Sequence, residues 1–251
     1  MESKKIIYYK QLDSTNTKLS LLAKQGAEHG TVVACESQTA GKGRSGRTWE
    51  SPEDGNIYMS ILLRPQICPS KAPMLTLVMA YSVAKVIKKY GFSEVKIKWP
   101  NDLVLSEKKV CGILTEMYLD ETNIDYVIVG VGINVNCKNI PQELSGKATS
   151  LYLESGKDIP KEQMLEEIVS MFKEDYLQFI QAGDLSFLQE QYNEMLINCN
   201  REVRILEPGN EYTAYALGID DVGQLRVRNK EGTETAVFAG EVSVRGVYGY
   251  V

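Results

Sequence analysis

The sequence is short of histidine, of paired cysteines and of long apolar runs. Its only histidine, His29, stands beside Gly30 in a segment typical of a turn, which argues against a Ser-His-Asp triad, a Cys-His pair or a metal site built from several histidines. The five cysteines are widely spaced and form no C-x-x-C pair, so we expect neither a zinc site nor a disulfide framework. No stretch approaches the ~20 apolar residues of a membrane span, and the N-terminus carries no secretion signal, so we expect a cytoplasmic protein without membrane contact.

Positive charge is also in deficit. Asp and Glu number 33 against 28 Lys and Arg, which gives a formal net charge of -5. A protein that binds nucleic acid over a broad face needs net positive charge there, so any cationic site must be local and no nucleic acid is expected as a partner. The 251 residues are 43% hydrophobic, which is enough for a large domain with a proper core and a second, small one.

Hydrophobic periodicity in the first 200 residues predicts helices packed on a sheet. The segment at 126–129 is β-branched and almost wholly apolar, which is typical of a central strand buried on both faces. Ser14 or Thr15 is expected to cap the first helix. The expected strands lie at 5–12, 31–35, 57–63, 95–99, 110–118 and 124–133, and the later helices at 69–91, 161–180 and 185–196.

The pattern changes after residue 200. Turn-forming residues there separate five short strand-like segments, at 202–206, 212–217, 225–228, 234–238 and 242–245. This spacing predicts a small antiparallel barrel of about 50 residues. We therefore expect two domains, residues 1–200 and residues 201–251.

Residues 37–49 carry the strongest functional signal. Glycines that expose backbone N–H groups alternate there with cations that donate charge-assisted hydrogen bonds to phosphate or carboxylate oxygens: Gly41, Gly43 and Gly46, with Lys42, Arg44 and Arg47. The glycines also match G-x-G-x-x-G, but no helix follows the third glycine, and the chain has no His-Arg-Asp or Asp-Phe-Gly tripeptide. A dinucleotide fold and a protein kinase therefore do not fit, and the segment predicts an anion-binding loop.

Three further motifs follow in order. Residues 98–102 place Asn101 and Asp102 after a proline, where short polar side chains bond to the main chain or point into a cleft. Lys109 precedes an apolar strand, and a hairpin would bring it back beside Asp102 at the end of the sheet. Residues 130–136 end the buried strand with glycines and asparagines, where the backbone can approach a ligand closely.

This order of motifs resembles the biotin protein ligases. The matching segments are residues 13–16, 36–49, 98–102, Lys109 with 112–114, and 132–134, and a looser resemblance extends to 148–151 and 240–245. The resemblance implies an α+β fold with a mixed, largely antiparallel sheet packed by helices, as in class II aminoacyl-tRNA synthetases and biotin protein ligases, with a small C-terminal SH3-like β-barrel. Lys42 stands where many members carry Arg, which keeps the charge but loses the bidentate fork.

The family resemblance also implies the activity. Such a ligase activates biotin with ATP to biotinyl-5′-AMP, releases pyrophosphate, and transfers biotin to a lysine of a biotin carboxyl carrier protein or domain. Biotin and ATP are then substrates, Mg²⁺ accompanies the nucleotide, and exposed strand edges leave a homodimer open. Some members carry an N-terminal DNA-binding domain, but here the first expected strand begins within the first ten residues, so we expect a form without it.

The resemblance assigns roles to individual residues. Those expected to act in catalysis are Arg44, Lys109 and Asp102, the last by attracting or deprotonating the acceptor lysine. Those expected to bind biotin are Ser14, Thr15, Asn16, Gln38, Gly41, Lys42, Gly43, Arg44, Lys109 and Gly112. Those expected to bind nucleotide are Arg44, Arg47, Trp49, Asn101, Lys109 and Asn134, with Asn134 also the candidate for placing Mg²⁺ through the phosphates.

Two other functions stay open at this point. A lipoate or octanoate ligase or transferase has a related sheet, but the polar set at 14–16 with Gln38 is unsuited to a plain alkyl chain. A non-catalytic biotin sensor would bind biotin without releasing pyrophosphate. The C-terminal barrel either stabilises the fold or closes over the nucleotide through Glu241 or Arg245.

Overall fold

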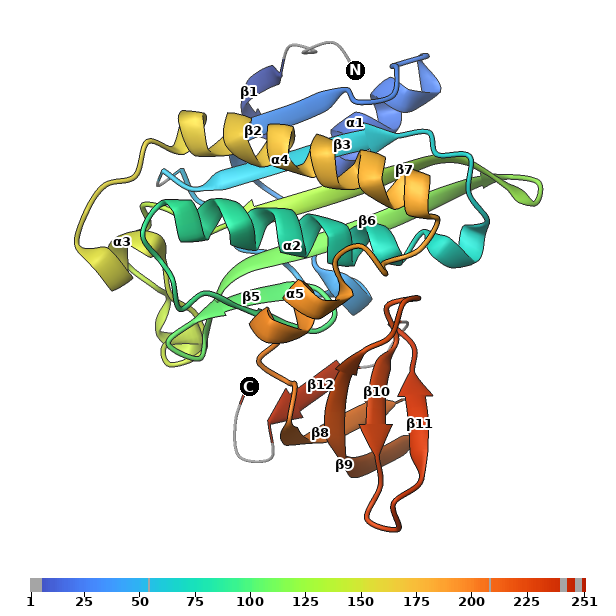
Figure 1. Ribbon diagram of the computed structural model, residues 1–251. Coiled ribbons are helices and arrows are strands. Elements are labelled where there is room, and N and C mark those ends of the chain that lie inside the picture. The colour runs from blue at the N-terminus through green and yellow to red at the C-terminus, as the bar shows by residue number, and fades with distance from the viewer. Residues whose placement is uncertain (1–5, 54, 208, 240–242, 247–249) are drawn as a thin grey trace.

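The computed structural model describes residues 6–53, 55–207, 209–239, 243–246 and 250–251 (Figure 1). Its larger sheet has seven strands in the order β1-β2-β3-β7-β6-β5-β4. β1 and β2 pair in parallel and the other neighbours pair antiparallel, so the expected mixed, largely antiparallel sheet is confirmed. The strands are β1 (Ile7–Leu12), β2 (Val32–Gln38), β3 (Ile57–Leu63), β4 (Lys96–Lys98), β5 (Asp102–Leu105), β6 (Lys108–Asp120) and β7 (Asn123–Ile133).

Two long helices cover one face of this sheet. α2 (Met74–Lys89) and α4 (Lys161–Ala182) run side by side across it (Figure 1). The expected helix at 69–91 begins later than predicted, because a short 3-10 turn (Pro69–Lys71) comes first and Pro73, which has no N–H, precedes α2. The shorter helices are α3 (Leu151–Ser155) and α5 (Gln189–Met195). None of the helices in the described ranges is both long and apolar enough to cross a membrane.

The opposite face of the sheet is only partly covered. α1 (Thr15–Lys24) packs there, where Leu19 and Ala23 join a small apolar cluster with Tyr126 and Ile128 of β7. Val127, Val129, Val131 and Ile133 of β7 face the larger core under α2 and α4 because side chains alternate along a strand. The central, buried position predicted for this strand is therefore confirmed.

Beyond this cluster several positions on the α1 side of the sheet carry small residues. Continuing the same alternation, β7 presents Gly130 and Gly132, β6 presents Gly112, and β3 presents Ser60. The sheet therefore has a floor of small residues next to the N-terminus of α1. This floor is where the candidate site lies.

The residues after 200 form a separate antiparallel sheet. Its strands are β8 (Arg201–Glu207), β9 (Asn210–Ile219), β10 (Leu225–Arg228), β11 (Glu234–Val237) and β12 (Ser243–Gly246), in the order β11-β10-β9-β8-β12. The outer strands β11 and β12 do not pair within the described residues, so the expected closed barrel is not confirmed. Residues 240–242, which include Glu241, lie outside the described residues.

Candidate active site

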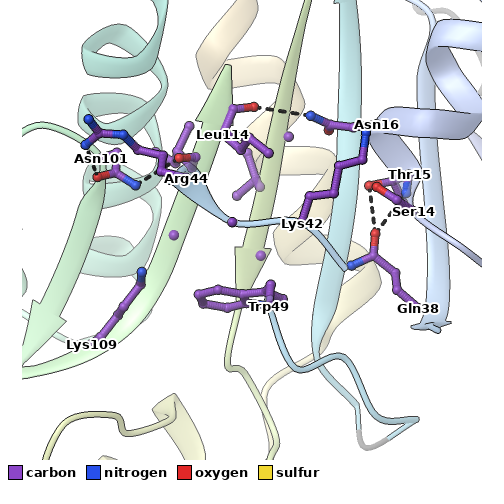
Figure 2. Close-up of a pocket in the computed structure, with 16 residues that line it drawn as sticks. Ser14, Thr15, Asn16, Gln38, Lys42, Arg44, Trp49, Asn101, Lys109 and Leu114 are labelled. Carbon is purple, nitrogen blue, oxygen red and sulfur yellow. Dashed lines mark hydrogen bonds between the residues drawn. The ribbon is translucent and has the colours of Figure 1, made fainter. Parts of the chain in front are cut away.

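A pocket that is partly open to solvent lies over the floor of small residues. Figure 2 shows polar side chains from the start of α1 and the end of β2 at one end of it, and Arg44, Asn101 and Lys109 at the other. Its lining residues are Ser14, Thr15, Asn16, Gln38, Lys42, Gly43, Arg44, Trp49, Asn101, Lys109, Gly112, Ile113, Leu114, Gly130, Val131 and Gly132. This mixture of polar and apolar walls suits a small-molecule ligand.

Trp49 lies across the glycine floor. A Cβ at Gly132 would stand 2.6 Å from the indole ring, and one at Gly112 would stand 2.8 Å from it. Both positions therefore require glycine for reasons of space. The indole Nε1 is buried and has no hydrogen-bond partner among the described residues, so a bound ligand with an acceptor oxygen would satisfy it.

The polar end of the pocket is a connected network. Gln38 Oε1 accepts a hydrogen bond from the backbone N–H of Thr15 at 2.8 Å, which satisfies one of the free N–H groups at the start of α1. Ser14 is the N-cap residue, as predicted, although its side chain makes no capping bond. The hydroxyl of Ser60, fully buried, donates to Asn16 Oδ1 at 2.6 Å and lies 2.7 Å from Thr15 Oγ1.

Glu116 extends this network to the anion-binding loop. Its Oε2 accepts a hydrogen bond from Asn16 Nδ2 at 2.6 Å, and its Oε1 lies 3.4 Å from the ammonium of Lys42. The Asn16 amide is thereby oriented, with its oxygen toward Ser60 and its nitrogen toward Glu116. The cation at position 42 is thus linked to the side chain expected to bind biotin.

The segment at 41–49, which we call the flap, folds as a small closed loop. Lys42 and Thr48 form an antiparallel bridge, and a 3-10 turn at Arg44–Gly46 makes the tip. Of the three glycines, only Gly46 adopts a left-handed conformation, with φ 71°. Gly41 is buried and needs glycine for another reason, because a Cβ there would collide with the Trp49 carbonyl and Ser51.

The tip of the flap is tied to the motif at 98–102. Arg44 donates a hydrogen bond to Asn101 Oδ1 at 2.9 Å, and Asn101 Nδ2 donates to the Ile113 carbonyl at 3.0 Å. Burial lowers the pKa of the Arg44 guanidinium, partly opposed by Asp102, but arginine stays charged in proteins. A permanent, partly desolvated cation therefore faces the pocket.

Lys109 and Asp102 meet at the end of the β5–β6 hairpin, as the sequence predicts. Lys109 Nζ lies 2.7 Å from Asp102 Oδ1 and 5.1 Å from the Trp49 ring centroid. Burial acts to raise the pKa of the Asp102 carboxyl, but Lys109, Lys98 and the Tyr250 hydroxyl outweigh it and hold that pKa below its usual value. Asp102 is therefore an ionised group that attracts a cation and is a weak proton acceptor.

Most of the residues predicted for the site line the pocket, and four do not. Gly41 is buried at the start of the flap, Arg47 is exposed on it, and Asp102 is buried behind Lys109. Asn134 follows β7 and donates its side-chain N–H to the Thr149 carbonyl at 3.0 Å. His29, given no catalytic role, accepts a hydrogen bond from the Arg64 backbone N–H at 2.9 Å and is absent from the pocket lining.

Three residues of the site were missed by the sequence interpretation: Ser60, Glu116 and Tyr250. Side chains alternate between the two faces of β3 and β6, and this alternation could have identified Ser60 and Glu116. A serine and a glutamate interrupt these apolar strands on the face that carries the glycines. No motif pointed to Tyr250, which is 148 residues from its partner Asp102.

The described residues contain no cluster of three or more His, Cys, Asp and Glu side chains that could hold a metal ion. The described residues therefore provide no resident metal site of that kind. Mg²⁺ commonly keeps several waters and binds through substrate phosphates, so the residues are compatible with an ion that arrives with a nucleotide.

The fold and the pocket together define a ligase class. The chain belongs to the biotin/lipoate A/B protein ligase family, whose family model matches residues 8–134. Residues 199–245 match the C-terminal domain of biotin protein ligases, which narrows the class to the biotin branch.

Similar proteins agree with this assignment. The chain is 38% identical over 231 residues to the bifunctional ligase/repressor BirA of Bacillus subtilis, covering 90% of this chain and 70% of the relative. It is 31% identical over 240 residues to the biotin–acetyl-CoA-carboxylase ligase of Mycobacterium tuberculosis, covering 92% of this chain and 86% of the relative. The solved biotin protein ligase of Aquifex aeolicus in complex with biotin and ATP is similar with a TM-score of 0.85 at 31% identity, covering 97% of this chain and 99% of that one.

Proposed function

We propose that this chain is an ATP-dependent biotin protein ligase. It activates biotin with ATP to biotinyl-5′-AMP, releases pyrophosphate, and transfers biotin to a lysine of a biotin carboxyl carrier protein or domain. The observation that carries the proposal is the pocket itself, which joins a polar end suited to a neutral head group with a cationic end suited to a carboxylate and a phosphate. The relatives named above are ligases of this type, and the solved relative was obtained with biotin and ATP.

In the first half-reaction a carboxylate oxygen of biotin attacks the α-phosphorus of ATP, and pyrophosphate leaves with the electrons of the broken P–O bond. Both reactants are anionic, so cations must hold them together. Arg44 and Lys109 border the cationic end of the pocket, and we assign them to the carboxylate and the α-phosphate, with Lys42 as a third cation. Each hydrogen bond to a charged group contributes about 1.5–3 kcal/mol, and preorganised charge is the main source of catalysis in phosphoryl transfer.

The head group of biotin is neutral and polar, and it loses its water on entering the pocket. We assign its ureido ring and tail to the polar end of the pocket, where small residues of the floor and flap let the ligand come close to the main chain. The side chains assigned to biotin are Ser14, Thr15, Asn16 and Gln38, and the glycines assigned to main-chain contact are Gly41, Gly43 and Gly112. A plain acyl chain would leave these buried polar groups without partners, which costs about 1–3 kcal/mol for each group.

We assign the nucleotide to the side of Lys109 that faces away from the biotin head group. Trp49 offers an aromatic surface and an unpartnered N–H, Asn101 an amide, and Arg47 an exposed cation on the flap. Asn134 is our candidate for contacting Mg²⁺ held by the phosphates, since its amide nitrogen is already bound to Thr149. When bound, the ion would neutralise phosphate charge.

In the second half-reaction the neutral amine of the acceptor lysine attacks the acyl carbon, and AMP leaves. That lysine is mostly protonated near neutrality because its usual pKa is about 10.4. We assign Asp102 to attracting the ammonium at longer range through its charge, since it is buried behind Lys109 and its lowered pKa makes it a poor base. The flap would exclude water from the mixed anhydride until the carrier arrives.

The chain forms two separate sheets, which supports two domains with different roles. We propose that residues 1–200 form the catalytic domain and that residues 201–251 form an SH3-like accessory module, since the two sheets share no strand. β1 lies at one edge of the larger sheet, which makes it our candidate for a homodimer contact. The reaction consumes ATP, so we place the enzyme in the cytoplasm.

Pyrophosphate exchange tests the function directly. Purified protein is mixed with ATP and labelled pyrophosphate, with biotin, lipoate or no acid added. We expect exchange with biotin only, followed by label transfer to a carrier domain when one is supplied. Exchange with lipoate but not biotin would identify a lipoate ligase, and biotin binding without exchange would identify a sensor.

A further inference from the structure

Tyr250 lies beside the candidate site, in contact with two residues of the motif at 98–102. Its hydroxyl donates a hydrogen bond to Asp102 Oδ2. The family matches cover residues 8–134 and 199–245, so this contact comes from a segment beyond both matched regions. Figure 1 marks the C-terminus beside β12, at the margin of the small sheet.

The hydroxyl completes the partners of a buried carboxylate. Asp102 is 8% exposed, its Oδ1 lies 2.7 Å from Lys109 Nζ, and its Oδ2 accepts from Tyr250. A carboxylate with a different partner on each oxygen cannot rotate without losing both. Tyr250 therefore keeps Oδ1 turned toward Lys109, which lines the pocket.

The ring of Tyr250 makes a second contact with the same motif. Lys98 Nζ lies 4.2 Å from the ring centroid, and Lys98 is only 6% exposed. An ammonium over an aromatic face is attracted to it, more strongly when water is excluded. The side chain therefore spans the motif at 98–102, with its ring on Lys98 and its hydroxyl on Asp102.

Val251 packs closely against β12 of the small sheet. A Cβ built at Gly246 in β12 would overlap the carbonyl of Val251. Glycine at 246 therefore allows the last residues to pack against the strand that they follow. This contact is independent of the one that Tyr250 makes with Asp102.

We propose that Tyr250 is a positioning residue for the ligase reaction, which orients the Asp102 carboxylate and, through it, the ammonium of Lys109. The inference rests on the proposed function, because Lys109 is the group that meets the reacting oxygens there. It also gives the segment that follows the C-terminal sheet a part in the reaction.

The test compares Tyr250→Phe with Tyr215→Phe, an exposed tyrosine of β9 in the same sheet. We expect Tyr250→Phe to lower kcat for biotin-dependent pyrophosphate exchange about tenfold, with KM for biotin changed less than about twofold. Tyr215→Phe should behave as wild type. In an Asp102→Asn background Tyr250→Phe should have little further effect, because the two residues act as a unit. Wild-type kcat in Tyr250→Phe, or an undiminished effect in Asp102→Asn, would overturn the proposal.

A second measurement needs no activity. Lys98 is labelled with limiting acetic anhydride and quantified by mass spectrometry, with the exposed Lys230 as the internal reference. We expect Tyr250→Ala and Gly246→Ala both to raise Lys98 labelling while thermal unfolding stays cooperative. Unchanged labelling would show that the ring does not cover Lys98, and would reject the proposal even if the ligase assignment holds. Absence of biotin-dependent exchange in wild type would instead reject the ligase function. The labelling result would still show whether Tyr250 covers Lys98.

Discussion

The guanidinium of Arg44 donates a hydrogen bond to the side-chain oxygen of Asn101 at 2.9 Å. This bond joins the tip of the flap to the turn before β5, and Asn101 is itself anchored to the Ile113 carbonyl of β6. A phosphate or carboxylate oxygen is a stronger acceptor for Arg44 than a neutral amide. The flap is therefore held over the pocket by a contact that an anionic ligand can replace.

Replacing Arg44 by Gly should let the adenylate escape. The variant loses both the bond to Asn101 and the cation nearest the mixed anhydride, so biotinyl-5′-AMP should leave and label nearby lysines of bystander proteins. Filter retention of radiolabelled adenylate measures this. Equal retention by the variant and the parent would contradict the prediction.

Lys109→Ala should cripple adenylation and leave the fold intact. The ammonium lies at a strand end and its side chain is partly exposed, so little packing is lost, and Lys98 and Tyr250 still stabilise the charge of Asp102. Loss of one preorganised donor, by contrast, costs about 10²–10³ in kcat. Pyrophosphate exchange gives the rate, and circular dichroism checks the fold. Lys108→Ala, on the neighbouring residue of β6, is the matched control, and full exchange in Lys109→Ala would rule the role out.

Glu116→Ala should raise KM for biotin more than it lowers kcat. The substitution frees the Asn16 amide and the Lys42 ammonium together, and an oriented amide binds a ureido group better than a mobile one. Glu116→Gln keeps an acceptor for Asn16 and should show a smaller increase. Asp120→Asn, exposed on the same strand, serves as the control, and identical KM values in all of these proteins would refute the role.

Stability should depend on pH through Lys98. Burial lowers its pKa from 10.5 to about 8, with Asp102 opposing the effect and Lys109, Arg245 and Arg44 adding to it. Between these values the unfolded chain binds more protons than the folded one, so the contribution of Lys98 to stability rises with pH. Compared with Lys98→Met, wild type should gain up to about 1.4 kcal/mol per pH unit across this window. Urea unfolding below pH 7 and at about pH 9 measures it, and a difference that does not vary with pH would contradict the prediction.

Asp175→Ala should destabilise the helical layer without touching the pocket. Asp175 is 1% exposed, binds Lys85 Nζ at 2.6 Å and accepts from Ser82 at 2.6 Å, which ties α4 to α2. Breaking a buried ion pair costs about 3–5 kcal/mol. Lys138→Ala breaks an exposed pair and should change stability by less than about 0.5 kcal/mol. Chemical unfolding of both variants gives the values, and similar losses would show that the buried pair is unimportant.

Much of this site follows from local sequence. The hairpin that joins Asp102 to Lys109 is short, so their contact could be predicted from spacing, and the glycines of β7 predicted a close approach to a ligand. The expected strands do not include residues 102–105, where Asp102 and the nearby Pro100 disfavour a strand, yet β5 pairs on both sides in the sheet.

The remainder depends on register and on contacts between distant segments. Ser60 and Glu116 lie on the face of the sheet that carries the glycines, where they contact Asn16, only because β3 and β6 pair with β7 in one particular register. A one-residue slip would reverse this. Tyr250 reaches Asp102 through the packing of one sheet against the other, for which no local pattern exists. Closure of the small sheet could not be inferred from strand count alone, because an open and a closed sheet have the same pattern.

The two tryptophans of the chain lie in opposite surroundings. Trp99 is 1% exposed, with its indole N–H bonded to the Gly223 carbonyl at 3.0 Å, whereas Trp49 lies in the pocket with its N–H unpartnered among the described residues. Only the emission of Trp49 should respond when the pocket fills, while Trp99 supplies a constant background. The unlabelled protein thus carries an intrinsic fluorescent reporter, with which stopped-flow measurements could time substrate entry and adenylate departure in a single trace.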